Sequence, residues 1–295
     1  VGDMRIRVPA TIANFGPGFD VFGVGIGEPY DELKFVESDE WEIEVEGYDV
    51  PTDGRNVAVV AARALATLVG EELYLRMKLR KEIRPRSGLG SSGASSLAGA
   101  LAAARVLGIE DDGLIIKAAL AGEEAASGSA HGDNVVPAYY GDFTIIESLN
   151  PLRVHRIPVD FPLVVVLPQI EVPTREARRI LPERVPMGDA VRNVALAGAL
   201  VKALTSGDVQ TVGRLLEDRI ALPYRLRLMP WFARVWKAAL DAGAYGAFVS
   251  GSGPAIFALG EDLHAIGKAI AEAFLEIGVD AEVYITRAGV GAFWL

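Results

Sequence analysis

A glycine- and serine-rich segment that leads directly into an alanine-rich run is the strongest chemical signal in this chain. Residues 85–104 read PRSGLGSSGASSLAGALAAA. Glycine lets the backbone turn sharply, whereas alanine and leucine favour a helix. The first N–H groups of a helix lack internal partners and carry the positive end of its dipole, so such a junction binds anions, above all phosphates. A flexible linker is the alternative, although linkers do not run directly into a helix.

Two common nucleotide-binding fingerprints do not describe this segment. A Walker A loop requires a lysine after its glycines, and none follows Gly88 or Gly90. Gly88, Gly90 and Gly93 match G-x-G-x-x-G, but residues 81–87 are charged and interrupted by a proline, unlike the strand of a dinucleotide-binding fold.

The full string of residues 85–95 resembles the phosphate-binding loop of the GHMP kinases, which phosphorylate small molecules. The resemblance implies that the protein binds ATP. It assigns ATP binding to Pro85, Ser87, Gly88, Leu89, Gly90, Ser91, Ser92, Gly93, Ala94 and Ser95.

Composition excludes several other classes of protein. The 295 residues are 51% hydrophobic and carry a net charge of −10, which argues against nucleic-acid binding. There is no cysteine, and the three histidines are too scattered to suggest a zinc site. Because no long apolar run and no signal-peptide pattern occur, we expect a cytoplasmic protein with no membrane partner.

Four cations stand just before the phosphate loop: Arg80, Lys81, Arg84 and Arg86. An acidic protein that binds a nucleotide must concentrate positive charge locally, and this cluster is one way to do so. A solvated strand end is an equally good interpretation.

The N-terminal region places polar residues inside an apolar stretch. Residues 4–10 alternate like a strand, and Asn14 and Asp20 then bracket a tight Gly-Pro-Gly turn. Buried polar groups must be paired or face a ligand. Alternatively, Asp20 caps a helix that begins at Val21.

The string PATIANFGPGFDVFG of residues 9–23 resembles the signature of one GHMP subfamily, the homoserine kinases. The resemblance implies that Asn14 and Asp20 contact the amino-acid substrate, L-homoserine. The chemistry agrees, because an α-ammonium group needs a carboxylate partner.

Two predicted helices of the first half carry further candidates. Asn56 is the expected N-cap of a helix that runs to Val69, and the resemblance places it beside the adenine. In the helix expected over 111–127, both Glu123 and Glu124 continue the apolar stripe. The residues do not choose between them, and two solvated glutamates are an alternative. The resemblance selects Glu124 as the Mg²⁺ ligand, together with Ser92.

Residues 127–134 form an expected polar turn that contains His131, Asp133 and Asn134. We assign His131 to the substrate site, although a lone histidine is more often structural. Many GHMP kinases have an aspartate base in this region, and the resemblance matches its position to Asn134. An amide accepts no proton at neutral pH, so the resemblance implies direct phosphoryl transfer with Asn134 orienting the hydroxyl. Asp133 remains an alternative base.

The second half contributes arginines and a third glycine-rich motif. Thr174 is the expected N-cap of a helix in which Arg175 opposes the helix dipole, so a nearby anion is expected. The resemblance assigns Arg175 and Arg225 to the substrate carboxylate, although a solvated arginine is an alternative for the former. Residues 251–254 read as a glycine hairpin, and the resemblance places Gly251 and Ser252 against the phosphate loop.

Together these features predict an α+β protein of two domains, 1–158 for ATP binding and 159–295 as the C-terminal GHMP domain. The resemblance implies a ribosomal protein S5 domain 2-like first domain and a ferredoxin-like second domain. It also implies phosphorylation of L-homoserine, in a chain that forms a homodimer. The alternatives are a GHMP kinase for another small alcohol, such as mevalonate or shikimate, and a catalytically silent regulator. The pairing of Ser92 with Glu124 argues against the silent protein.

Overall fold

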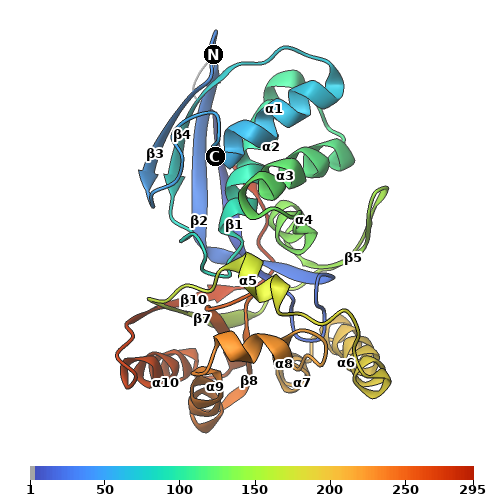
Figure 1. Ribbon diagram of the computed structural model, residues 1–295, viewed down its shortest axis with the longest axis vertical. Helices are drawn as coiled ribbons and strands as arrows, with labels where there is room; N and C mark the ends of the chain where they lie inside the picture. The colour runs from blue at the N-terminus through green and yellow to red at the C-terminus, as the bar shows by residue number, and fades with distance from the viewer. Residues whose placement is uncertain (1–3) are drawn as a thin grey trace.

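The computed structural model describes residues 4–295 and contains two β-sheets, each covered by helices (Figure 1). The first sheet and helices α1–α4 form one layered unit, and the second sheet with helices α5–α10 forms the other. The predicted α+β class is therefore confirmed.

Seven strands make up the first sheet, in the order β11-β1-β2-β4-β3, with β5 pairing with both β2 and β6. All of its strand pairs are antiparallel except β3 with β4. The strands are β1 (Met4–Ala13), β2 (Phe22–Glu37), β3 (Glu42–Gly47), β4 (Leu75–Lys81), β5 (Phe143–Leu149), β6 (Leu152–Ile157) and β11 (Phe293–Trp294). In β4 apolar and charged residues alternate, so one face is buried and the other is exposed.

Four helices cover one face of this sheet: α1 (Val57–Val69), α2 (Ser91–Leu107), α3 (Asp112–Ser127) and α4 (Gly132–Tyr140). Helix α2 is buried along most of its length, and its small residues allow close packing. A Cβ on Gly99 would overlap the backbone of Ala58 in α1, so glycine is required there. This packing fixes the N-terminus of α2, where the phosphate loop ends.

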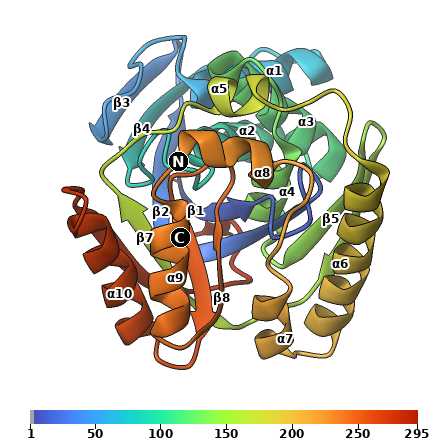
Figure 2. The same cartoon turned by 60° about the horizontal axis from the view of Figure 1, so that its bottom comes forward.

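The second sheet is antiparallel in the order β10-β7-β9-β8. Its strands are β7 (Pro162–Pro168), β8 (Ala244–Val249), β9 (Ile256–Gly260) and β10 (Ala281–Arg287). Its helices are α5 (Thr174–Arg179), α6 (Met187–Thr205), α7 (Val209–Arg214), α8 (Leu222–Arg225), the 3₁₀ helix η1 (Leu226–Leu228), α9 (Phe232–Asp241) and α10 (Leu263–Leu275). Helices α9 and α10 lie side by side against this sheet (Figure 2).

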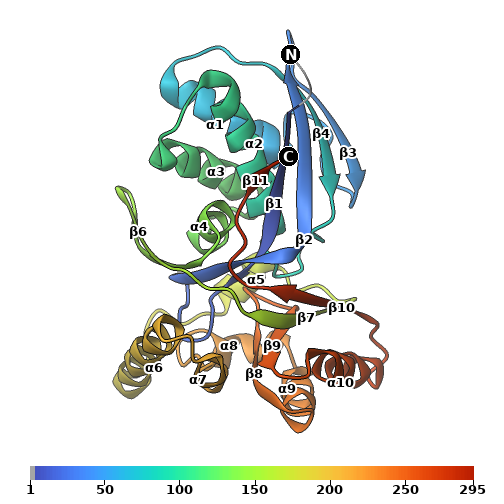
Figure 3. The ribbon, with the colours of Figure 1, turned by 180° about the vertical axis from the view of Figure 1, so that it is seen from behind.

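An apolar core connects the two units. The ring of Phe15 lies 5.4 Å from that of Phe143 in the first sheet and 4.8 Å from that of Phe257 in the second. The chain end also returns to the first sheet, where β11 pairs with β1 (Figure 3). The second sheet begins at Pro162, close to the predicted boundary, but the last residues of the predicted second domain belong to the first layer.

Most predicted elements are present, with Asn56 as the N-cap of α1 and Gly108 ending α2. Two local predictions and one alternative interpretation were wrong. No helix follows Asp20, because Phe22 begins the long strand β2. Residues 132–140 form a short helix and not only a turn. Pro173, not Thr174, caps α5.

Within residues 4–295, no helix is long and apolar enough to cross a membrane.

Candidate active site

A cleft of about 1120 Å³ lies between the two units. Its lining combines the phosphate loop, the Asn14–Asp20 turn, the end of α3, the start of α4, helix α5 and the glycine hairpin. Such a volume accommodates two small substrates at once. The motifs singled out in the sequence therefore meet in one place.

The phosphate loop ends in a helix N-terminus that has no side-chain cap. Gly90 precedes α2 with a φ of +72°, and no side chain accepts a hydrogen bond from the first helical N–H groups. These N–H groups can therefore bind an anion. Most predicted loop residues line the cleft, but Leu89, Gly93 and Ala94 do not, and the side chains of Leu89 and Ala94 pack into the core.

Backbone contacts from the other motifs hold this loop in place. The Ala255 N–H donates to Ser87 O at 3.1 Å, and the Ser250 hydroxyl donates to Gly88 O at 2.7 Å. A Cβ on Gly88 would collide with the backbone oxygens of Ser250 and Gly253. The glycine hairpin thus packs directly against the phosphate loop, and Gly251 and Ser252 line the cleft.

The cations ahead of the loop have different environments. Lys81 is buried and forms an ion pair with buried Asp31, while its Nζ donates to Ser91 O at 2.9 Å. Ser95 also donates to Asp31, at 2.8 Å. This buried network holds the first turn of α2 in place. By contrast, Arg86 is exposed and pairs with Glu171 across the cleft.

Glu123, and not Glu124, faces the cleft. Glu123 is 4% exposed and lines the cleft, and a Cβ on Gly93 would lie 3.8 Å from its Oε2. Glu124 is exposed and is absent from the lining. The choice of Glu124 therefore does not fit the structure. The sequence contained a signal that Glu124 is exposed. Glu124 lies seven residues after the exposed Lys117, so both residues lie on the same face of α3.

A metal site at this point would consist of oxygen ligands. Ser92, in the first turn of α2, and Glu123 both line the cleft. Among residues 4–295 no cluster of three His, Cys, Asp or Glu side chains could hold a metal ion. Mg²⁺ needs no such cluster, because one carboxylate, water and substrate phosphates commonly complete its octahedron. Ser92 and Glu123 therefore fit Mg²⁺ bound together with a nucleotide.

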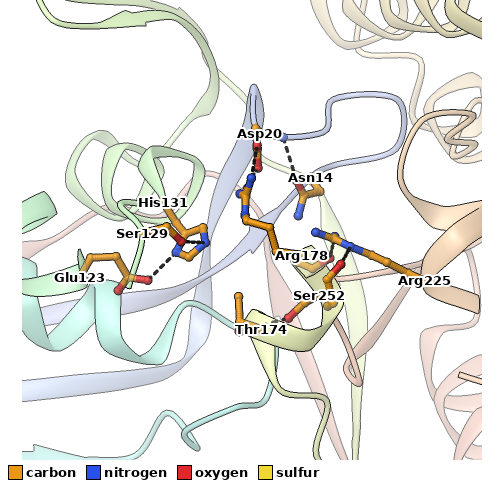
Figure 4. Close-up of polar contacts among 11 residues, drawn as sticks. Asn14, Asp20, Glu123, Ser129, His131, Thr174, Arg178, Arg225 and Ser252 are labelled. Atoms are coloured by element: carbon orange, nitrogen blue, oxygen red, sulfur yellow. Dashed lines mark hydrogen bonds and ion pairs between the residues drawn. The ribbon is translucent and has the colours of Figure 1, made fainter. Parts of the chain in front are cut away.

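His131 links Glu123 to the loop that precedes α4. Its Nδ1 lies 2.9 Å from Glu123 Oε1, and its Nε2 lies 3.1 Å from the Ser129 hydroxyl (Figure 4). Burial lowers the pKa of His131, but the hydrogen bond and charge of Glu123 outweigh this effect, and the net pKa is raised. His131 is therefore a donor to Glu123 and fixes the direction of its carboxylate.

The Asn14–Asp20 turn holds both residues in a left-handed conformation, with φ values of +54° and +58°. Asparagine and aspartate tolerate this region better than most residues, and such strain is common at functional sites. The Asp20 N–H donates to Asn14 Oδ1 at 2.8 Å. Helix α6 anchors the turn, because Asn193 Nδ2 donates to Pro17 O at 2.7 Å.

Two arginines of the second unit approach the carboxylate of Asp20 in this turn. Arg178 binds both Asp20 oxygens, at 2.9 and 2.8 Å, and this hydrogen bonding raises the pKa of Arg178 (Figure 4). Arg225 is buried and donates to Gly251 O at 3.1 Å. Both guanidinium groups lie over the ring of Phe19. The cleft thus contains a carboxylate and two guanidinium groups side by side.

The sequence did not single out Arg178. Arg175 also lines the cleft, but it is exposed and approaches Gly128, where a Cβ would lie 3.1 Å from its Nη2. Arg178 is the arginine of α5 that adjoins Asp20 and shares Phe19 with Arg225. The predicted two-arginine arrangement is therefore better matched by Arg178 with Arg225.

Two residues at the start of α4 complete the cleft. Asn134 Oδ1 accepts a hydrogen bond from the Thr11 hydroxyl at 2.9 Å. Asp133 is 3% exposed, and its pKa is raised to about 6 by burial and by the Asp20 carboxylate. An aspartate with a raised pKa and an amide thus lie next to each other near the phosphate loop.

Asn56 lines the cleft but uses its side chain in local structure. Its Oδ1 accepts from Ala58 N at 2.9 Å, and its Nδ2 donates to Pro51 O at 2.6 Å. The predicted N-cap is confirmed. An adenine contact for this residue remains a prediction.

Comparisons with known proteins agree with this geometry. Residues 56–142 match the model described as "GHMP kinases N terminal domain", and residues 200–276 match "GHMP kinases C terminal". A homoserine kinase of Thermococcus gammatolerans is 72% identical over 99% of this chain and 100% of its own. A homoserine kinase of Pyrococcus abyssi is 66% identical over 98% and 99%. The crystal structure of homoserine kinase from Cytophaga hutchinsonii superposes with a TM-score of 0.90 at 35% identity, covering 99% of this chain and 97% of that one.

The chain therefore belongs to the GHMP kinases, two-domain α+β enzymes that are phosphotransferases. Within that family it belongs to the homoserine kinases, as the full-length relatives establish.

Proposed function

We propose that this protein transfers the γ-phosphoryl group of ATP to the side-chain hydroxyl of L-homoserine, which yields O-phospho-L-homoserine on the way to threonine. The arrangement of Asp20, Arg178 and Arg225 in the same cleft as the N-terminus of α2 carries this proposal. A zwitterion is bound by one anion and one or more cations, and a helix N-terminus is a favourable site for a triphosphate.

Each charged side chain has a role in holding the amino acid. Arg178 and Arg225 bind the α-carboxylate, and Asp20 binds the α-ammonium group. Arg178 and Asp20 bind each other in the structure, so homoserine binding replaces this ion pair with two. Because that pair is about 40% exposed, breaking it costs no more than about 1 kcal/mol.

The phosphoryl group is held from the other side. The N–H groups of the first turn of α2 would bind the phosphates, and Ser92 and Glu123 would hold Mg²⁺. The metal ion, when bound, neutralises charge on the phosphates. The glycine hairpin keeps the loop rigid, so the phosphate does not move away from the hydroxyl.

The acceptor hydroxyl loses its proton during transfer, and Asn134 cannot accept that proton. We infer that Asn134 orients the hydroxyl of homoserine. The oxygen of that hydroxyl forms a bond to the γ-phosphorus while the bond from the γ-phosphorus to the bridging oxygen of ATP breaks. The hydroxyl proton passes to a phosphoryl oxygen. Asp133 lies nearby with a raised pKa, and its carboxylate adds negative charge that favours the ammonium group of the substrate.

A substrate panel tests the proposal. Purified protein with ATP and Mg²⁺ should phosphorylate L-homoserine with a far higher kcat/KM than mevalonate or shikimate, because the latter lack an ammonium group. Preference for either of those alcohols would replace the proposal with its alternative, and no turnover of any of them would indicate a silent relative.

We also expect a cytoplasmic homodimer, as predicted from the sequence. Size-exclusion chromatography with light scattering measures the oligomeric state directly.

A further inference from the structure

Thr11 is a buried residue of β1 that reaches three parts of the active site. Its side chain is 1% exposed. Its N–H donates to Leu89 O in the phosphate loop at 3.1 Å, and its carbonyl lies 3.5 Å from the Ser250 hydroxyl beside the glycine hairpin. Its own hydroxyl donates to Asn134 Oδ1 at 2.9 Å. No other part of the proposed mechanism uses this hydroxyl.

The local strand geometry turns Thr11 toward the loop. The pairing of β1 with β2 shifts register between Pro9 and Thr11. Such irregularities re-aim side chains and are common next to active sites. At this shift the Thr11 N–H forms its hydrogen bond to the phosphate loop, so the end of β1 contacts the loop as well as the neighbouring strand β2.

Gly90 shows how closely the Thr11–Asn134 pair approaches the phosphate loop. A Cβ on Gly90 would overlap the Thr11 hydroxyl and would lie 2.8 Å from Asn134 Oδ1. Gly90 is also the residue that precedes α2, with a φ of +72°. The hydrogen-bonded pair therefore lies against the loop where the first helical N–H groups begin.

The direction of this hydrogen bond determines which end of the Asn134 amide is available. A side-chain amide has one acceptor oxygen and one NH₂ donor group. Because the Thr11 hydroxyl donates to the amide oxygen, it fixes that oxygen on the Thr11 side, and the NH₂ group points away from Thr11. An NH₂ group that donates to the substrate hydroxyl leaves the proton of that hydroxyl for a different acceptor, and a phosphoryl oxygen of the nucleotide can accept it.

We propose that Thr11 is a positioning residue that holds the Asn134 amide with its NH₂ group toward the acceptor hydroxyl. This inference rests on the proposed function, since Asn134 acts on the alcohol substrate there. The inference adds that the orientation of the Asn134 amide, and not only its presence, favours direct transfer of the phosphoryl group to the hydroxyl.

Four variants test the inference: Thr11→Val, Thr11→Ser, Asn134→Ala and the Thr11→Val/Asn134→Ala double variant. Valine replaces the hydroxyl with a methyl group of similar size, so kcat should fall about tenfold, the worth of one buried hydrogen bond. The KM values for ATP and the alcohol should change less than about twofold, because Thr11 touches neither. Serine keeps the hydroxyl, so Thr11→Ser should retain most of the wild-type kcat.

The double variant separates positioning from general support of the fold. If Thr11 acts through Asn134, the valine substitution should cause no further loss in the Asn134→Ala background. An equal loss in both backgrounds, or an unchanged kcat in Thr11→Val, would overturn the inference. Should the valine variant fail to fold, Thr11→Ala removes the same hydrogen bond without adding a methyl group beside Gly90, and the same cycle applies.

The wild-type substrate panel keeps the two claims apart. If the protein phosphorylates a different alcohol, the proposed function fails, and the four variants are then measured with that alcohol. If homoserine is the substrate but the cycle shows no coupling, only the role of Thr11 fails.

Discussion

Replacing Asp133 with asparagine should stabilise the protein and weaken its catalysis, because this carboxylate is buried inside the cleft. Burial and the neighbouring Asp20 charge raise the pKa of Asp133 to about 6, compared with 3.8 for an ordinary aspartate. A difference of about two pKa units corresponds to about 3 kcal/mol between the folded and unfolded states. The N-terminus of α4 stabilises an acidic residue in its first turn by only about 0.3–1 kcal/mol, so desolvation dominates.

The sign of the effect depends on pH. Below about pH 4 the carboxyl is protonated in both states and no difference arises. As the pH rises from about 4 to 6, the unfolded chain releases this proton while the folded protein still holds it, so the folded protein loses stability. The Asp133→Asn variant lacks this loss, and above pH 6 it should be about 3 kcal/mol more stable than the wild type.

Guanidinium unfolding at pH 3.5 and pH 7.5 measures this difference. Glu124→Gln is the matched control, because that carboxylate is exposed near the same cleft and should change the unfolding free energy by less than about 0.5 kcal/mol. At pH 7.5 the KM of Asp133→Asn for homoserine should rise several-fold, since negative charge near the ammonium group is lost. A variant that is less stable than the wild type at pH 7.5 would refute the reasoning, because it would mean that contacts hold Asp133 in its charged form.

The other charged residues of the cleft give three further predictions. Glu123→Gln should lower Mg²⁺-dependent kcat by at least about 100-fold with the fold intact by circular dichroism, whereas Glu124→Gln should be close to wild type; equal losses in both would count against Glu123 as the metal ligand. Arg178→Met should raise the KM for homoserine about 10- to 100-fold with little change in the KM for ATP, and Arg175→Met should raise it less than threefold; the reverse order would restore Arg175 to the carboxylate. Asp20→Asn should weaken homoserine binding, measured by titration calorimetry, about 10- to 100-fold. An unchanged affinity would show that Asp20 does not bind the ammonium group.

The sequence was sufficient wherever a short stretch determines its own geometry. The glycines of the phosphate loop and the alanine-rich run after it predict an anion-binding helix N-terminus, and Gly90 and α2 form one. Asn56 is likewise a local N-cap. These features depend on propensity and on neighbours within a few residues, so a pattern can reveal them.

Choices between neighbouring residues depended on contacts that the local pattern does not contain. Arg175 and Arg178 are three residues apart on one short helix, and only the position of Asp20, far away in the sequence, separates them. The contact between Thr11 and Asn134 joins residues that are 123 positions apart. Helix α4 was missed because it is short, contains Pro137 and follows a polar turn.

Initial rates with two substrate analogues test most directly whether this cleft selects a zwitterionic alcohol. 4-Hydroxybutyrate is homoserine without its ammonium group, and 3-aminopropan-1-ol is homoserine without its carboxylate. Because Asp20 on one side and Arg178 with Arg225 on the other each lose a charged partner, kcat/KM should fall at least about 100-fold for each analogue. Turnover of either analogue at a rate close to that of L-homoserine would contradict the proposed arrangement.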